Sequence, residues 1–269
     1  MASTFLGFHI QRVKPEGRWV VHLRPTAKST QRVKKKIKDL TSGQPMTPPV
    51  VATHRGKNQI FKVGTTASFG LKEIAENGNN APLLDSLSSD KGVSDVVEAP
   101  GGPLVPPGTP GSGMFDDRTQ FTITSHGGAR RLSFAMMLIC TNDGFTGVNS
   151  VKLPKHVGDK VTARTNAYDA GTELNTEDFA DIVPPCQSLI GVTSGEPGTG
   201  TSNPALLEGG VIHHHAGILG GSDLVLAIHG WDTTRPVAKI TIEAVAAMNP
   251  ERAVAVTKAF AGPVGPAAR

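Results

Sequence analysis

Alternation of polar and apolar positions is the main pattern in this chain, and it predicts a set of short β-strands. It is clearest at Gln120–Thr124, Val161–Tyr168 and Ala238–Val245, and a further short strand is expected at Ile60–Val63. Arg131–Cys140 is apolar almost throughout, as is typical of a central strand buried on both faces. Period-two strands separated by turns rich in Gly, Pro, Asn and Asp predict an all-β fold, an antiparallel β-sandwich.

Helical spacing is confined to short segments. Residues 68–77 place Leu71 and Ile74 on one face, and residues 81–88 contain a Leu-Leu-x-x-Leu pattern. A third helical stretch is expected at Thr176–Ile182. These segments are short enough to lie in the connections of a sandwich.

The first forty residues have a different composition from the rest. They hold ten Lys and Arg against two acids, whereas the whole chain has 27 basic and 23 acidic residues, so residues 41–269 are net acidic. Phe5–Ile10 and Trp19–Leu23 predict a hairpin, and Gln31–Leu40 predicts a helix. The basic face of this helix would consist of Arg32, Lys34, Lys35 and Lys38. Such a face could bind a phosphate backbone.

This basic segment resembles the palm–thumb junction of group II intron reverse transcriptases. The resemblance is carried by Phe5-Leu-Gly-Phe-His-Ile-Gln-Arg12, Leu23-Arg-Pro25 and the run from Lys28 to Ile37. The catalytic carboxylates of that family have no counterpart here, so polymerase activity is not expected. The resemblance implies a remnant that binds nucleic acid.

Two acidic turns predict a site for a hard cation. Thr141-Asn-Asp-Gly-Phe145 and Tyr168-Asp-Ala-Gly-Thr-Glu173 each follow a predicted strand, and either a strand at Val151–Lys155 between them or a crossover could bring them to one rim. Calcium takes six to eight oxygen ligands, which carboxylates on such loops can supply. Ordinary Asx-turns without an ion are the alternative.

Residues 41–245 also resemble the bacterial form of the spondin domain. The matching elements are Ser42–His54, Ser94–Val97, Cys140–Gly147, Asn166–Glu173 and His229–Trp231. The resemblance implies a C2-like sandwich that is secreted or periplasmic and binds a surface or matrix ligand. It also implies calcium ligation by Asp143, Asp169 and Glu173, although Tyr168 and Glu173 depart from the family's Trp-Asp-Ala-Gly-Thr-Asp element.

Histidines offer a rival site. His213 and His215 would share a face of an extended segment and, with His229, could bind zinc or copper in a metal-dependent enzyme. Exposed loop histidines are the alternative. No Gly-x-Ser-x-Gly elbow or nucleotide-binding loop occurs in the sequence, so catalysis is not expected.

Two cysteines allow one disulfide. Cys140 and Cys186 are either bridged or two buried thiols, depending on whether the chain reaches an oxidising compartment. No apolar run is long enough to span a membrane, and no secretory signal is visible. The expected organisation is therefore a basic appendage at 1–40, a sandwich at 41–247 and a flexible tail rich in Ala, Pro and Gly at 248–269.

Overall fold

The computed structural model describes residues 43–56, 60–192 and 196–245, together with the backbone of three strand segments at 3–5, 8–10 and 253–261. The chain divides into two compact units, residues 1–40 and 41–269. In the first unit, β1 (Ser3–Phe5) pairs antiparallel with β2 (Phe8–Ile10). Phe5–Ile10 is therefore not one continuous strand, and the expected pairing with Trp19–Leu23 lies outside the described residues, which exclude 11–40.

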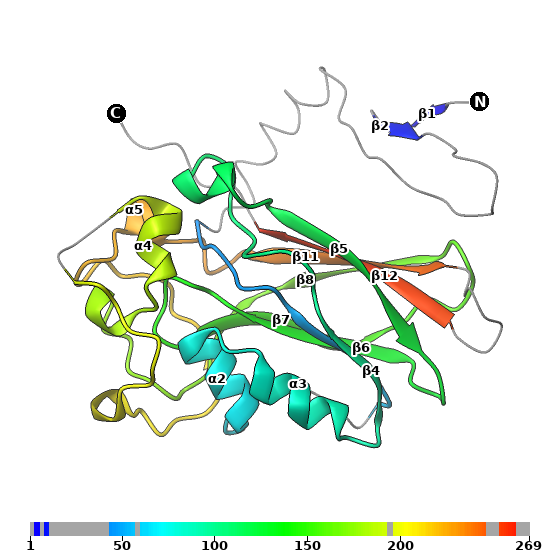
Figure 1. Ribbon diagram of the computed structural model, residues 1–269, viewed down its shortest axis with the longest axis horizontal. Helices are drawn as coiled ribbons and strands as arrows, with labels where there is room; N and C mark the ends of the chain where they lie inside the picture. The colour runs from blue at the N-terminus through cyan, green and yellow to red at the C-terminus, as the bar shows by residue number, and fades with distance from the viewer. Residues whose placement is uncertain are drawn as a thin grey trace. The chain divides into compact units, whose positions relative to one another are not determined.

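The second unit contains two antiparallel sheets (Figure 1). The six-stranded sheet has the order β10 (His213–His214), β9 (Ala167–Asp169), β7 (Gly144–Lys152), β6 (Arg131–Met137), β3 (Val50–His54) and β4 (Val93–Glu98). The four-stranded sheet has the order β5 (Arg118–Ser125), β12 (Ala253–Ala261), β11 (Ala238–Val245) and β8 (Lys160–Thr165). The predicted all-β sandwich class is confirmed.

Two helices lie against the six-stranded sheet, α2 (Phe69–Asn77) and α3 (Ala81–Ser88), and both contact strands of that sheet (Figure 1). The four-stranded sheet contributes Ile123, Ile240 and Ile242 to the buried core. Strand β6 lies in the interior of the larger sheet and is buried from Leu132 to Met137, which explains its continuous apolar sequence.

The helix predictions at 68–77 and 81–88 are confirmed. Ser68 is the N-cap of α2, and its hydroxyl accepts a hydrogen bond from the Leu71 amide at 3.2 Å. Gly78 ends the helix in the left-handed conformation, with φ of 65°. The strand prediction at 238–245 is also confirmed, with the same bounds.

Other boundaries differ from the sequence predictions. Ile60–Val63 is not a strand; Ile60 and Phe61 are buried, but the backbone is irregular there. The predicted strand at 161–168 is two strands, because the chain leaves β8 after Thr165 and enters the other sheet as β9. The stretch 176–182 holds only a single 3-10 turn, η2 (Phe179–Asp181), and the following helix, α4 (Pro185–Ile190), contains Cys186.

The expected flexible tail contains a central strand. Strand β12 pairs with β11 along Ala238–Val245 and with β5 along Arg118–Ser125. In its sequence, Ala-Val-Ala-Val-Thr-Lys-Ala-Phe-Ala, larger residues alternate with Ala and Thr, but Lys258 interrupts the apolar series and the alanines weaken the strand signal. Without β12, β5 would not be hydrogen-bonded to the rest of its sheet.

Candidate functional site: an acidic rim beside a disulfide

The two acidic turns meet at one end of the six-stranded sheet. Asp143 directly precedes β7, and Asp169 ends β9; the register pairs Gly144 with Asp169. The Thr141 hydroxyl shapes the turn before β7, since it donates to the Leu138 carbonyl at 2.6 Å and accepts from the Gly144 amide at 2.9 Å. Because β7 and β9 are antiparallel, the start of one and the end of the other share a rim.

Asp143 is fully buried, and its two carboxylate oxygens differ in their contacts. Oδ2 accepts hydrogen bonds from the Thr172 amide at 2.7 Å, the Thr172 hydroxyl at 3.2 Å and the Glu173 amide at 3.0 Å. Oδ1 has no hydrogen-bond partner among the described residues. A buried carboxylate oxygen without a donor is costly unless a cation or water reaches it.

Asp169 is also buried, and the turn that follows it supplies its donors. Its Oδ1 accepts from the Gly171 amide at 2.8 Å, and its Oδ2 accepts from Asn175 Nδ2 at 2.7 Å. Gly171 adopts φ of 69°, and a Cβ there would lie 2.6 Å from the Val211 amide nitrogen. The close approach of this turn to residues 208–211 therefore requires glycine.

Glu208 is the third acid of the rim. One ligand atom from each of Asp143, Asp169 and Glu208 lies within 4.8 Å of the other two. The Glu208 amide donates to the Thr172 carbonyl at 3.2 Å, which fixes the residue beside the Asp169 turn, and its side chain is exposed. We refer to these three residues as the acidic rim.

Glu173, the third ligand expected from sequence, is not part of that group. Its backbone amide contacts Asp143, but its carboxylate accepts from the Asn203 amide at 2.8 Å. Burial is the main factor that raises the pKa of Glu173 to about 7, with Glu76 and Asp181 adding to it. The structure therefore groups Glu208 with Asp143 and Asp169, and no sequence motif indicated Glu208.

The acidic rim is electrostatically unfavourable without a cation. Burial, followed by the negative charge of Asp169, raises the pKa of Asp143 to about 7, despite the donors on Oδ2. Two neighbouring carboxylates disfavour each other's ionised form, whereas a bound cation stabilises both.

His213 lies beside this rim. It pairs in register with Asp169, and its Nδ1 lies 3.7 Å from Asp169 Oδ1. A hydrogen bond between Nδ1 and the Val211 carbonyl is the main cause that raises the pKa of His213, and Asp169 adds to it. Its side chain is about half exposed, so its charge is partly screened by solvent.

The other two histidines are in different surroundings. His215 is buried with its ring 5.0 Å from Trp231, and its Nδ1 accepts from the Gly217 amide at 3.0 Å. His229 is buried 5.8 Å from the Phe179 ring, and its Nδ1 accepts from the Val225 amide at 2.8 Å. Burial lowers the pKa of both imidazoles. The three histidines do not form a common group of ligands, so the zinc or copper site is not assembled.

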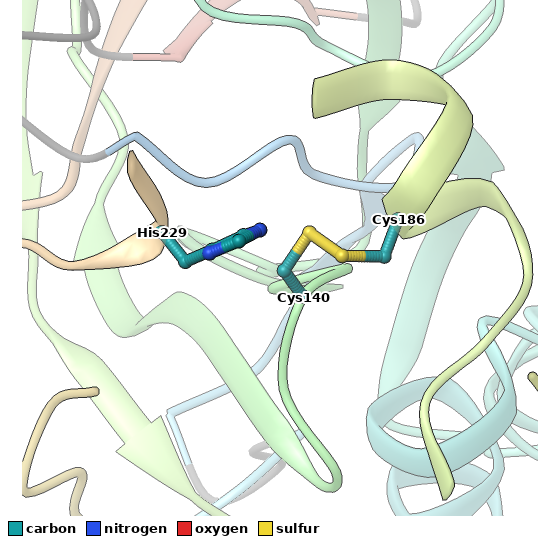
Figure 2. A group of neighbouring side chains, drawn as sticks. All are labelled: Cys140, Cys186 and His229. Carbon is teal, nitrogen blue, oxygen red and sulfur yellow. A yellow bond between two sulfur atoms is a disulfide. The ribbon is translucent and has the colours of Figure 1, made fainter. Parts of the chain in front are cut away.

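Cys140 and Cys186 form a disulfide behind the rim, with an S–S distance of 2.09 Å and a Cα–Cα distance of 5.0 Å. It joins the turn after β6 to α4, and the His229 ring points toward it (Figure 2). Because Nδ1 of His229 accepts a backbone N–H, its neutral ring carries the proton on Nε2. That nitrogen is buried and has no hydrogen-bond partner among the described residues.

Glu177 is a second residue that sequence reasoning missed. It has φ of 58°, and its carboxylate accepts from the amides of Gly220 and Gly221 at 2.7 and 2.8 Å. Its carbonyl accepts from the Asp223 and Leu224 amides. The carboxylate and the carbonyl of this one residue together fix the glycine-rich loop that follows the histidine segment.

The basic residues proposed to contact nucleic acid, Arg32, Lys34, Lys35 and Lys38, lie outside the described residues. In the part of the chain that the structure does describe, no helix is long and apolar enough to cross a membrane.

The fold and the acidic rim together define a class of protein: a β-sandwich with an internal disulfide and with acidic loops gathered at one end. The sequence profile of the Spondin_N family matches residues 34–180, more than half of the chain. The protein therefore belongs to the Spondin_N family, which indicates an extracellular module of the binding or adhesion type. No match was found among curated proteins.

The second resemblance is not supported. The Spondin_N match begins at residue 34, inside the Lys28–Ile37 run attributed to a reverse transcriptase, and the comparisons give that attribution no support.

Proposed function

We propose that this protein is a non-catalytic extracellular binding module whose acidic rim is held by one calcium ion. The observation that carries the proposal is the convergence of Asp143, Asp169 and Glu208, with the buried Oδ1 of Asp143 lacking a donor among the described residues. The three residues come from three separate loops, so an ion bound by them would cross-link those loops.

The chemistry of the donors favours calcium over a softer metal. All three side chains offer carboxylate oxygens, which suit hard cations, whereas zinc and copper favour imidazole or thiolate. Two described imidazoles near these loops already have partners: His213 contacts the Val211 carbonyl and Asp169, and Nδ1 of His215 accepts from the Gly217 amide. Glu208 is exposed, so the remaining coordination positions would face solvent or a partner.

Exposed apolar side chains beside the rim support a role in partner binding. Leu207 is 67% exposed, Leu174 is 49% exposed and Val211 is 45% exposed. Leu207 forms a β-bridge with Glu173, and Val211 lies against Gly171, so all three are carried by the loops that form the acidic rim. Apolar residues gathered on adjacent loops are typical of an interaction surface.

The candidate nucleophiles in the sequence are Ser188, Ser194, Cys140 and Cys186. Ser194 lies outside the described residues, and the other three support the non-catalytic part of the proposal. The two cysteines are joined to each other, and the Ser188 hydroxyl donates to the Pro185 carbonyl at 3.1 Å and has no histidine partner. Neither arrangement activates a nucleophile.

The proposal is tested by thermal unfolding with EDTA and then with added calcium. We expect EDTA to lower the melting temperature and calcium to restore it, because an ion that binds only the folded state stabilises that state. Asp143→Asn should abolish the calcium response, whereas Asp116→Asn, which alters an exposed acid that is not part of the rim, should retain it. Melting curves that do not change with EDTA or calcium would refute a structural ion.

A further inference from the structure

A concave site lies at the end of the sandwich opposite the acidic rim. It is a pocket of about 830 Å³ bounded by the β5–β6 turn, the start of β6 and the residues that end and follow β7, with Gly56 and Ala244 also contributing. Strand β7 runs from Gly144 at the acidic rim to Lys152 at the pocket. Its length of nine residues separates the two sites by about 30 Å.

The lining of this pocket is strongly basic. It includes Arg130, Arg131, Lys152 and Lys155, and no Asp or Glu is among the lining residues. Arg130, Lys152 and Lys155 are exposed, and none of them takes part in an ion pair found between described residues.

Acidic residues on the neighbouring elements already have other partners. Asp159 accepts from His156 Nδ1 at 3.0 Å, and Glu243 pairs with Lys160 at 2.9 Å. These two acids do not line the pocket, so no lining side chain neutralises the pocket's positive charge.

Two of the basic residues oppose each other directly. The β6–β7 register pairs Arg131 with Lys152, so their side chains leave the same face of the sheet. Like charges at directly opposite positions of an antiparallel pair are destabilising. Arg131 Nη1 donates to the Ser150 carbonyl at 2.8 Å, which positions its guanidinium but does not reduce its charge. An anion between the two side chains would relieve this repulsion.

The remaining lining gives the pocket an open, partly apolar shape. The Ala129 amide donates to the His126 carbonyl at 3.1 Å and closes a tight turn in which Gly127 and Gly128 have φ of 61° and 83°. These two glycines place no side chain in the mouth of the pocket. Half-buried Leu153 and Pro154 supply an apolar surface among the cations.

We propose that this pocket binds a sulfated or phosphorylated saccharide. Its volume lies in the range of pockets for small ligands and is much larger than a single inorganic anion needs. The arginine guanidiniums match the geometry of sulfate and phosphate oxygens, and the lysines add point charge. A sugar ring carries several such groups on a frame whose C–H faces can contact Leu153 and Pro154.

Nucleic acid fits the pocket less well. Binding of single strands relies on aromatic side chains on which bases stack, and the lining holds no Phe, Tyr or Trp.

The test is calorimetric titration of the full chain with sucrose octasulfate and with inositol hexakisphosphate, using sucrose and inositol as uncharged controls. Lys152→Gln with Lys155→Gln removes two pocket charges. Lys62→Gln with Arg164→Gln removes two exposed charges that do not line the pocket, so it is the matched control. The basic residues 1–40 are present in every protein, so their contribution cancels in the comparison.

We expect the wild type and the control to bind at least one of the two polyanions and neither neutral sugar. The pocket variant should bind about tenfold more weakly, or weaker still, the equivalent of about 1.4 kcal/mol. The preferred probe then identifies sulfate or phosphate as the ligand group. Arg130→Gln provides a second pocket variant if the double variant does not fold. Equal affinity of pocket variant and control, or no binding of either polyanion by the wild type, would overturn the proposal.

Discussion

At the scale of single residues, Asp143 is the position where burial and charge conflict most strongly. Its Oδ2 accepts three hydrogen bonds, which favour the carboxylate, yet burial and Asp169 together raise its pKa to about 7. The ordinary value is 3.8, so in the metal-free protein the folded state binds this proton more tightly than the unfolded state does. A calcium ion would compete with that proton.

This conflict predicts how stability varies with pH in EDTA. Because the pKa is higher in the folded state, the contribution of Asp143 is fully present below the unfolded value of about 4 and is lost as pH rises through about 7. From pH 8 to pH 5, Asp143 should add about 2–4 kcal/mol to the free energy of unfolding. Urea denaturation at both pH values measures this change.

Asp143→Asn serves as the control, since other groups also titrate in this range. Glu173 contributes in the same direction, whereas the lowered pKa values of His54, His215 and His229 act in the opposite one. The difference between wild type and Asp143→Asn gives the contribution of Asp143, including the part that acts through the pKa of His213. Identical pH dependence in both proteins would contradict the assignment.

The disulfide is a second prediction at this scale. The bridge spans a sequence separation of 46 residues, and closing such a loop stabilises by about 4 kcal/mol in the chain-entropy model. The double variant Cys140→Ala with Cys186→Ala should lower the free energy of unfolding by about this amount in urea denaturation. Reductant should destabilise the wild type and leave the variant unchanged. Equal stability of the two proteins without reductant would contradict a structural role for the bridge.

At the scale of elements, sequence patterns identify α2, α3 and β11 because each has a strong local signal. Ser68 and Gly78 mark the ends of α2, and β11 alternates strictly. Strand β7 was not predicted in full because its first half is buried on both faces and contains two glycines, so it lacks alternation. Its pairing with β6 and β9 is a long-range property that no local pattern reveals.

The candidate site was predictable to a similar degree. Asp143 and Asp169 carry a local signal, since each belongs to a turn at the end of a strand. Glu208 carries none: it reaches the rim only because residues 207–211 pair with 171–173. The position of Glu173 in its turn makes it a candidate ligand. Its neighbours along the chain do not indicate that its carboxylate accepts a hydrogen bond from the Asn203 amide.

Strand β12 gives a prediction for the element scale. It lies between β5 and β11, so its removal would separate β5 from its sheet. Truncation after residue 252 should therefore yield protein that is insoluble or lacks a cooperative unfolding transition. Truncation after Ala261 spares the strand and is the matched control. If the protein that ends at residue 252 unfolds cooperatively at the wild-type temperature, β12 is dispensable.

At the scale of the molecule, the sandwich separates its charges along the strands. Acidic residues from three loops gather at the end where β7 begins, and four cations line the pocket where it ends. The formal net charge of +4 describes neither end. The two proposed sites therefore lie at opposite ends of the same compact unit, one proposed for a cation and a partner, the other for an anion.

Calorimetric titration of the metal-free protein with calcium tests the central claim most directly. We predict one calcium ion per chain, with weaker binding in Glu208→Gln and unchanged binding in Glu98→Gln, an exposed acid outside the rim. Glu173→Gln should retain the site because its carboxylate contacts Asn203 instead. No calcium binding by the wild type, or equal affinity in Glu208→Gln, would contradict the account.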